Sequence, residues 1–400
     1  MASQNPTPPT RRLHPNIWFL TIGSFLTDVS SEMVNNMVDL FLLNVLGVQT
    51  SIIGLIEGIA EATASLVKLF SGGLSDRLGK RKWLTVSGYA LSALSKPFLY
   101  FATTWEGVLG VRFSDRFGKG IRTAPRDALL ADSAKSDQRG LSFGLHRAGD
   151  TAGAFVGLAI AGLIIWLIQP GASQLQRHTF QVLVLASIIP AFLAVLVLAV
   201  GVKELAVARK EKKDQSPLSW TALARRFRVF LIVVVIFTLG NSSDSFIILR
   251  GQNRGLNLLQ IIAMLMTFNA VYALLAGPLG SLSDRIGRQK LMLAGWTVYG
   301  LVYLGLALSH TGVQIWLLYG IYGIYYALTE GAAKALVADI VPQEQRGAAY
   351  GYFNAAIGLA TLPASLIAGI LWQFVNPAAP FVFGAVLALL AGFLLVTWVK

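Results

Sequence analysis

The sequence predicts an all-α membrane protein of twelve transmembrane helices in two parallel, pseudo-symmetric six-helix bundles. The first observation is composition, because 54% of the 400 residues are hydrophobic and 13% are charged, whereas soluble domains carry about 25% charged residues. Mean hydropathy is correspondingly high, at +0.61. The second observation is a short polar motif that occurs twice, at 72–82 and at 280–290, an offset of 208 positions. Half of the chain therefore resembles the other half.

Apolar stretches long enough to cross a hydrocarbon core of about 30 Å recur along the whole chain. We expect spans at 16–43, 51–73, 83–103, 106–132, 140–168, 179–201, 228–249, 258–280, 290–309, 313–340, 347–373 and 379–399. The polar start, residues 1–16, is not followed by a short apolar region with a small-residue cleavage site. We therefore expect the first span to remain as a transmembrane helix in the lipid bilayer.

The basic residues are distributed unevenly between the two sides of these spans. Lys and Arg number 33 against 20 Asp and Glu, and their densest stretch is the polar segment after the sixth span. Positive charge collects in cytoplasmic loops, and an even number of spans puts both termini on that side. We expect an inner-membrane protein with cytoplasmic termini, and this distribution argues against nucleic-acid binding.

A second repeated pattern extends the duplication. The sequence Ala-Leu-Leu-Ala-Asp at 128–132 returns as Ala-Leu-Val-Ala-Asp at 335–339, an offset of 207 positions. Because each copy holds an even number of spans, the two copies have the same orientation. The predicted domains are residues 1–201, a basic cytoplasmic linker at 202–226, and residues 227–400.

With its twelve spans, central basic loop and paired Gly-x-Leu-x-Asp-Arg-x-Gly-Arg/Lys motifs, the chain resembles transporters of the major facilitator superfamily. The resemblance implies a secondary transporter, not an enzyme, that alternates access by rocking two bundles around a small-molecule substrate. A Gly-x-x-x-x-Gly-Lys-Ser/Thr loop for ATP is absent, so we expect a proton gradient to drive it. The chain has no cysteine, and we expect no cofactor, no metal site and a monomeric protein.

The repeated motif is predicted to form a cytoplasmic gate. Two of its glycines allow close helix approach and two permit a turn with positive φ. Its aspartates are expected to act as latches that accept hydrogen bonds from arginines and backbone donors. For its lysines the alternative is a turn exposed to solvent, without a role in gating. The predicted gate residues are Gly72, Asp76, Arg77, Gly79, Arg81, Gly280, Asp284, Arg285, Gly287 and Arg288.

Ionisable residues inside the spans mark a second set of candidates, because charge in a bilayer is costly and usually functional. From the outer end of the fourth span, Arg112 lies about 10 Å deep and Arg116 about 16 Å deep. By contrast, Arg122, Arg126 and Asp127 are predicted to be interfacial. The candidates for substrate binding or coupling are Asp28, Glu32, Glu61, Arg112, Arg116, His146, Arg147, Asp244, Glu330 and Lys334.

The resemblance implies that the first, fourth, seventh and tenth spans line a central cavity, which contains most of these candidates. Proton coupling is predicted for Asp28, Glu32 and Glu61, with His146 as a weaker candidate. The alternative is internal neutralisation by ion pairs that require no ligand. The pairs considered are Glu330 with Lys334, Asp115 with Arg112, and Asp150 with Arg147.

Two positions depart from the pattern of the family. The fourth-span arginine that precedes a Gly-x-Gly is replaced by Ser114, although Arg112 and Arg116 lie two residues on either side. The fifth span keeps Gly153 and Gly157 at a spacing suited to close packing, but lacks the following proline of antiporters.

The direction and substrate are predicted from different features. The doubled loop motif favours export, and the mid-depth arginines favour an organic anion or metabolite, because guanidinium binds carboxylate and phosphate bidentately. The main alternative is a multidrug or cation efflux antiporter with an acid-lined cavity. A non-transporting membrane receptor is a more distant alternative.

Overall fold

The computed structural model describes residues 13–135, 138–205, 223–342 and 346–399. This part of the chain is helical throughout and contains no strand. Its helices are α1 (Pro15–Asn44), α2 (Thr50–Leu78), α3 (Arg81–Ser95), α4 (Phe98–Phe101), α5 (Trp105–Ser133), α6 (Arg139–Ile168), α7 (Arg177–Gly201), α8 (Arg225–Gly240), α9 (Ser245–Asn253), α10 (Leu258–Ile286), α11 (Arg288–Leu308), α12 (Gly312–Ile340), α13 (Arg346–Phe374) and α14 (Ala379–Trp398).

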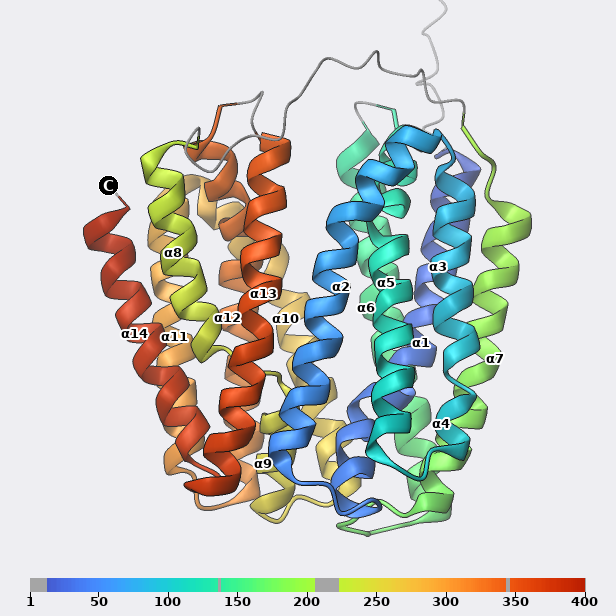
Figure 1. The fold of residues 1–400 in the computed structure, drawn as a ribbon, viewed down its shortest axis with the longest axis vertical. Helices are drawn as coiled ribbons and strands as arrows, with labels where there is room; N and C mark the ends of the chain where they lie inside the picture. Colours follow the sequence, from blue (N-terminus) through green and yellow to red (C-terminus); the bar gives the residue numbers. More distant parts are fainter. Residues whose placement is uncertain (1–12, 136–137, 206–222, 343–345, 400) are drawn as a thin grey trace, which may run out of the picture.

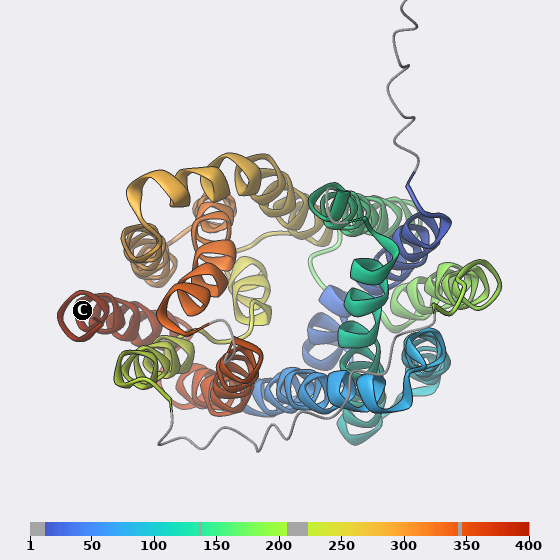
Figure 2. The ribbon, with the colours of Figure 1, turned by 90° about the horizontal axis from the view of Figure 1, so that it is seen from above.

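The helices form two groups that lie side by side, α1–α7 and α8–α14 (Figure 1). In the first group α1 packs against α6 and α7, while α5 packs against α2 and α3. In the second, α12 packs against α10 and α11, and α14 packs against α8 and α11. The groups meet where α2 lies along α13 and where α6 contacts α10 (Figure 2). The predicted all-α architecture of two bundles is confirmed, whereas the domain limits remain a prediction.

Two of the predicted spans are broken rather than continuous. The span expected at 83–103 consists of α3 and the short α4, interrupted at Lys96 and Pro97, where proline removes a backbone donor. The span expected at 228–249 is interrupted at residues 241–244, between α8 and α9. Side chains at both breaks face the protein interior, so the breaks bring polar groups to the middle of the molecule.

Seven helical segments of the described residues have the length and apolar composition to cross a membrane. They include the unit of α8 and α9 and the whole of α14. Helices α1, α2 and α5 do not reach that composition, and all three carry charged residues in their middle turns. The charged helices are therefore the ones that need shelter from lipid, and they lie towards the other group.

The repeated motif forms a helix–turn–helix corner in each group. Helix α2 ends at Leu78, and the turn before α3 is Gly79 and Lys80, with Gly79 at φ +62°. The corresponding turn between α10 and α11 is the single residue Gly287, at φ +95°. The predicted positive φ of both glycines is confirmed. The one-residue difference in turn length explains why the offset changes from 208 before the turn to 207 after it.

Glycines allow helices to pack closely at two places. On α6, a Cβ at Gly153 would lie 2.4 Å from the carbonyl oxygen of Phe25, and one at Gly157 would lie 2.5 Å from that of Val29. The predicted close packing at this pair is confirmed. On α2, a Cβ at Gly54 would lie 2.2 Å from the carbonyl oxygen of Ser365 on α13. This second contact joins the two groups.

Hydrogen bonds close the end of the molecule that contains α9, which we call the α9 end (residues 169–176 and 252–258). The amide of Leu258 donates to the carbonyl of Ala172 at 3.0 Å. The Gln252 amide side chain donates to the carbonyl of Ser173 at 2.6 Å. Both bonds run between the groups. The opposite end carries the two motif corners and is called the motif end (residues 79–80 and 287).

Candidate functional site

A cavity of about 570 Å³ lies between the two groups of helices. One wall comes from α1, α2 and α5, and the other comes from α8, α11, α12, α13 and the break at 241–244. Six of the predicted binding or coupling residues line it: Glu61, Arg112, Arg116, Asp244, Glu330 and Lys334. Their role in binding remains a prediction, but the fold does bring them together around one space.

The wall of the first group is built from ion pairs at two depths. Arg112 of α5 pairs with Glu57 of α2 and also donates to the side chain of Asn35 at 3.1 Å. The side chains of this pair are only 4% and 5% exposed. One turn nearer the motif end, Arg116 pairs with Glu61 at 3.3 Å, and Glu61 is 38% exposed. The inner pair is therefore sealed, and the outer one reaches solvent.

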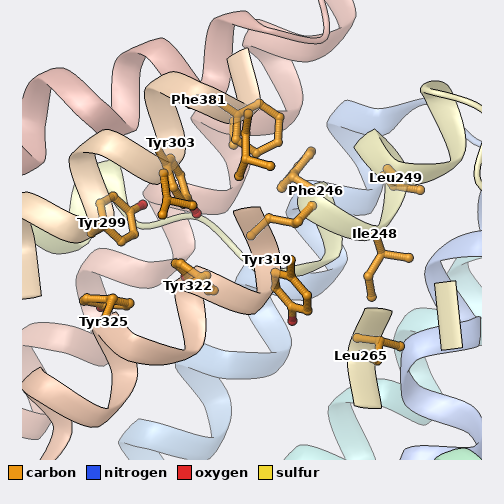
Figure 3. Packing of buried hydrophobic residues seen from close by; sticks show 14 of the residues in the cluster. Phe246, Ile248, Leu249, Leu265, Tyr299, Tyr303, Tyr319, Tyr322, Tyr325 and Phe381 are labelled. Atoms are coloured by element: carbon orange, nitrogen blue, oxygen red, sulfur yellow. The ribbon is translucent and has the colours of Figure 1, made fainter. Parts of the chain in front are cut away.

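The wall of the second group is backed by a core of tyrosines, of which Tyr325 lines the cavity itself. Tyr299, Tyr303, Tyr319, Tyr322 and Tyr325 pack together from α11 and α12, and Figure 3 shows their rings gathered in the core of this group. At the break between α8 and α9, the carboxylate of Asp244 accepts hydrogen bonds from the hydroxyls of Tyr322 at 2.9 Å and Tyr326 at 3.2 Å. The tyrosines thus hold an acidic group at the cavity surface.

A chain of contacts crosses between the groups nearer the motif end. Arg147 of α6 donates to the hydroxyl of Tyr272 on α10 and to Glu330 on α12, the latter at 3.3 Å. Tyr272 donates in turn to Glu330, which also pairs with Lys334 at 3.7 Å. Arg147 and Lys334 are more than half exposed. The exposure of these two side chains and of Glu61 shows that the cavity reaches solvent on the side of the motif end, opposite the closed α9 end.

Four candidates, Asp28, Glu32, His146 and Arg147, lie outside the residues that line this cavity. Glu32 accepts a hydrogen bond at 2.7 Å from Asn36, which does line it. His146 is buried and contacts Asp150 at 3.4 Å, within the first group. Glu32 therefore reaches the cavity through Asn36, whereas His146 contacts a residue of its own group.

The ion pairs differ from two of the three considered as internal neutralisation. Arg112 pairs with Glu57 rather than with Asp115, and Arg147 pairs with Glu330 rather than with Asp150. The pair of Glu330 with Lys334 forms, at 3.7 Å. The two mismatches have one cause: sequence spacing detects partners on the same helix, whereas these arginines reach partners on other helices.

The interfacial assignment of the inner half of α5 also needs refinement. Arg122 is buried, donates to Ser92 at 2.9 Å and stacks over the ring of Tyr89. Arg126 donates to Asp127 at 2.8 Å and to Ser24 at 3.3 Å. These cations are therefore held by side chains of the first group, and their interfacial position remains a prediction.

Sequence reasoning missed several residues of the site. Asp39 of α1 lines the cavity, and its Oδ1 atom is buried without a hydrogen-bond partner among the described residues. Glu57 of α2 also lines the cavity and was not among the predicted site residues. The tyrosines of α12 recur at spacings of three and four, a helical stripe that points to one shared face.

The break at Lys96 contacts two neighbouring serines of α1. The Lys96 ammonium group donates to the hydroxyl of Ser30 at 2.6 Å and to that of Ser31 at 3.1 Å. Lys96 is 3% exposed, so a buried cation ties the α3–α4 break to α1. Its position behind the cavity wall makes it a structural contact within the first group.

The gate motif is described in part. The side chains of Asp76, Arg77 and Asp284, and the surroundings of Gly280, lie outside the described residues, so the latch remains a prediction. Arg81 pairs with Asp132, and Arg288 pairs with Asp339. Arg285 is exposed. A Cβ at Gly72 would meet Ala124 at 3.4 Å, an ordinary contact, so close approach does not require glycine there.

The charges that line the cavity do not balance. Arg112, Arg116 and Lys334 each have a carboxylate partner, in Glu57, Glu61 and Glu330 respectively. Among the described residues, neither Asp39 nor Asp244 has a basic partner within 4 Å. Two carboxylates therefore remain for a ligand or a proton to neutralise.

Two helical groups around a polar cavity, closed at one end and open at the other, define a membrane protein with a central solute-sized compartment. The family model described as Major Facilitator Superfamily matches residues 20–264 and 229–400. The chain belongs to this superfamily of transporters. The predicted family is therefore confirmed.

Individual transporters of known sequence or structure are also similar to this chain. The chain is 36% identical over 395 residues to the Uncharacterized MFS-type transporter MJ1317 of Methanocaldococcus jannaschii, covering 96% of this chain and 95% of the relative. It is 24% identical to a Multi-drug resistance efflux pump PmrA homolog of Lactococcus lactis, with 90% and 94% covered. A crystal structure of a mutant of the nucleoside transporter NupG superposes with a TM-score of 0.80 at 14% identity, covering 95% and 99%, which shows a shared fold.

Proposed function

We propose that the protein is a proton-coupled exporter of organic cations. The observation that carries the proposal is the charge imbalance of the cavity, in which Asp39 and Asp244 lack basic partners among the described residues. An organic cation placed beside Asp244 gains a carboxylate and the faces of neighbouring aromatic rings. Cations over aromatic rings are stabilised by about 0.5–2 kcal/mol. This substrate class was the alternative in the sequence interpretation.

Alternating access would proceed by rocking of the bundles at 1–201 and 227–400, joined by the linker at 202–226. The bonds at the α9 end and the contacts of Arg147 at the motif end join these bundles at opposite ends of the cavity. Opening of the α9 end together with fuller closure of the motif end would expose the cavity to one side at a time. The repeated gate motifs lie at the motif end, where such closure would occur.

The orientation follows from the positive-inside bias, which places both termini and the linker in the cytoplasm of an inner-membrane protein. The cavity would then open to the cytoplasm in this conformation. Export is supported by the efflux function named for the Lactococcus lactis relative. Protons moving inward would be carried by carboxylates within the spans, for which Asp28, Glu32 and Glu61 were the sequence candidates.

An organic anion is the second candidate substrate. Among the described residues, the buried Nε atoms of Arg112 and Arg116 have no hydrogen-bond partner. Because Glu61 is partly exposed, a carboxylate or phosphate ligand can displace it and receive two bonds from Arg116. The sealed pair of Arg112 and Glu57 is less available for such an exchange.

Binding and transport of two probes distinguish these candidates. Ethidium serves as the aromatic cation and benzoate as the anion, with the purified protein in liposomes under an imposed pH gradient. We expect ethidium binding to weaken about tenfold in Asp244→Asn, equivalent to about 1.4 kcal/mol, and to persist in Arg116→Ala. Benzoate binding lost in Arg116→Ala, without ethidium binding by the wild type, would support the anion instead.

A further inference from the structure

The break between α8 and α9 places a run of polar residues opposite α1. Residues Asn241, Ser242, Ser243 and Ser245 line the same cavity as Asp39. The hydroxyls of Ser243 and Ser245 are 2.9 Å apart. Unwound segments inside membrane helices release backbone carbonyls, and such carbonyls coordinate coupling cations in transporters. The break therefore supplies neutral oxygen ligands at the interface between the two groups.

Asp39 supplies the charge that this oxygen-rich surface lacks. This residue is 2% exposed, and its Oδ1 atom has no hydrogen-bond partner among the described residues. A buried carboxylate in that state is costly unless a proton or cation accompanies it. The unpartnered oxygen is a second observation, independent of the helix break, that points to an occupant.

The charged and polar groups around Asp39 come from three helices. They are Glu57 on α2, Arg112 and Arg116 on α5, and the hydroxyl of Ser245 on α9. Arg112 already donates to Glu57 and to Asn35, and Arg116 pairs with Glu61. The two carboxylates of Asp39 and Glu57 thus share one sealed guanidinium. Asp39 and Glu57 together carry one more negative charge than Arg112 neutralises.

We propose that Asp39, the break at 241–244 and the adjoining Ser245 form a binding site for the coupling ion. This ion is a monovalent cation, either a proton or sodium. This inference rests on the proposed function, because it names the site where that exporter would load its driving ion; sodium at this site would replace the proton as that ion. A proton would bond to Oδ1 of Asp39. Sodium would bind to the same carboxylate together with serine hydroxyls and carbonyl oxygens of the break.

The position of the site gives it a mechanical role. Asp39 belongs to the first group of helices, and the break belongs to the second. A cation between them neutralises Asp39 and holds the two groups together at the closed α9 end of the cavity. Loss of the cation leaves an unpaired charge at that contact, which favours separation of the groups and opening of that end.

Cation binding is tested on the purified protein without any transported substrate. Asp39→Asn is compared with the wild type and with Glu106→Gln, an equivalent change at an exposed residue in the first turn of α5. Sodium chloride is titrated against choline chloride while the melting temperature is measured. In parallel, potentiometric titration counts the protons released from acidic to alkaline pH.

If the ion is sodium, we expect a sodium-specific rise in melting temperature that Asp39→Asn abolishes and Ser245→Ala weakens. If it is a proton, we expect Asp39→Asn to lose one proton release near neutral pH, whereas Glu106→Gln loses one in the acidic range where exposed carboxyls titrate. If Asp39→Asn does not fold, Asp39→Glu is used in its place because it retains the charge. It should still show the sodium-dependent melting temperature or the proton release, at a shifted sodium concentration or pH. Wild-type behaviour of Asp39→Asn in both titrations overturns the site.

Transport assays separate failure of the site from failure of the proposed function. With the site correct, Asp39→Asn exchanges ethidium across liposomes at equilibrium but no longer accumulates it under a pH or sodium gradient. Accumulation that persists in Asp39→Asn contradicts the site and leaves the exporter intact. A wild type that shows the cation signal yet moves no ethidium contradicts the proposed function and leaves the site.

Discussion

The guanidinium of Arg81, at the start of α3, pairs with the carboxylate of Asp132 at the end of α5. The same contact recurs 207 positions later, between Arg288 at the start of α11 and Asp339 at the end of α12. The two repeated sequence patterns of each half therefore bind each other. When the two motifs are aligned by Gly79 and Gly287, Arg288 corresponds to Lys80 in sequence. Because the second turn is one residue shorter, Arg288 instead occupies the structural position of Arg81, at the start of its helix.

The two pairs are predicted to differ in strength because their burial differs. Arg81 and Asp132 are 11% and 35% exposed, whereas Arg288 and Asp339 are 28% and 51% exposed. We expect double-mutant cycles to give a coupling energy of about 1–2 kcal/mol for the first pair and about 0.5 kcal/mol for the second. Alanine variants and thermal unfolding in detergent measure both. Equal coupling in the two halves would contradict this ranking.

Removal of Arg112 is predicted to destabilise the protein far more than removal of Arg116. Arg112→Ala leaves Glu57 as a buried charge without its partner, which costs about 3–5 kcal/mol. Arg116→Ala leaves Glu61, which reaches solvent, and should cost about 1 kcal/mol or less. Melting temperatures of the two variants provide the measurement.

A second change serves as the control for this comparison. Adding Glu57→Gln to Arg112→Ala removes the unpaired charge and should recover part of the lost stability. Similar melting temperatures for Arg112→Ala and Arg116→Ala would show that the inner pair is not sealed from solvent.

A single methyl group on α6 is predicted to disturb its packing on α1. The Cβ of Gly157→Ala would lie 2.5 Å from the carbonyl oxygen of Val29, so the helices must move apart, at a cost of about 1–3 kcal/mol. Gly144→Ala on the same helix meets no atom of the described residues within 4 Å and is the matched control. We expect its melting temperature to stay level or rise slightly, since alanine favours helix. A similar loss in both variants would refute the packing argument.

The closed α9 end is predicted to open during transport. Because the chain has no native cysteine, Ser173→Cys with Gln252→Cys gives a clean cross-linking pair across the contact between these segments. A short bifunctional thiol reagent should join them in the conformation described and block transport. The single-cysteine variants, treated identically, should retain transport. Full activity of the cross-linked protein would show that this contact need not break.

Much of the architecture follows from patterns that lie within one segment of the chain. Apolar length, basic asymmetry and duplicated motifs predicted the helical bundles, and positive φ at Gly79 and Gly287 followed from their place in a turn. Six of the ten binding or coupling candidates line the cavity because intramembrane charge is rarely placed elsewhere.

What the sequence did not predict depends on contacts between helices. The partners of Arg112 and Arg147 lie on α2 and on α12, at separations that no spacing rule links. The conspicuous arginines suggested an anion site, yet in the folded protein carboxylates neutralise them. Asp39 is an ionisable residue of the first span like the chosen candidates, but its position opposite the break in the seventh span is visible only in the folded protein.

The sequence alone predicted the helices, their duplication, the family and an orientation, because each prediction rests on local composition or on repetition. The tertiary structure decided which charges pair, which carboxylates remain unpaired and which end of the cavity is closed. Those properties arise from packing between α1, α2, α5 and the second group, and packing between distant segments has no periodic signature in the chain.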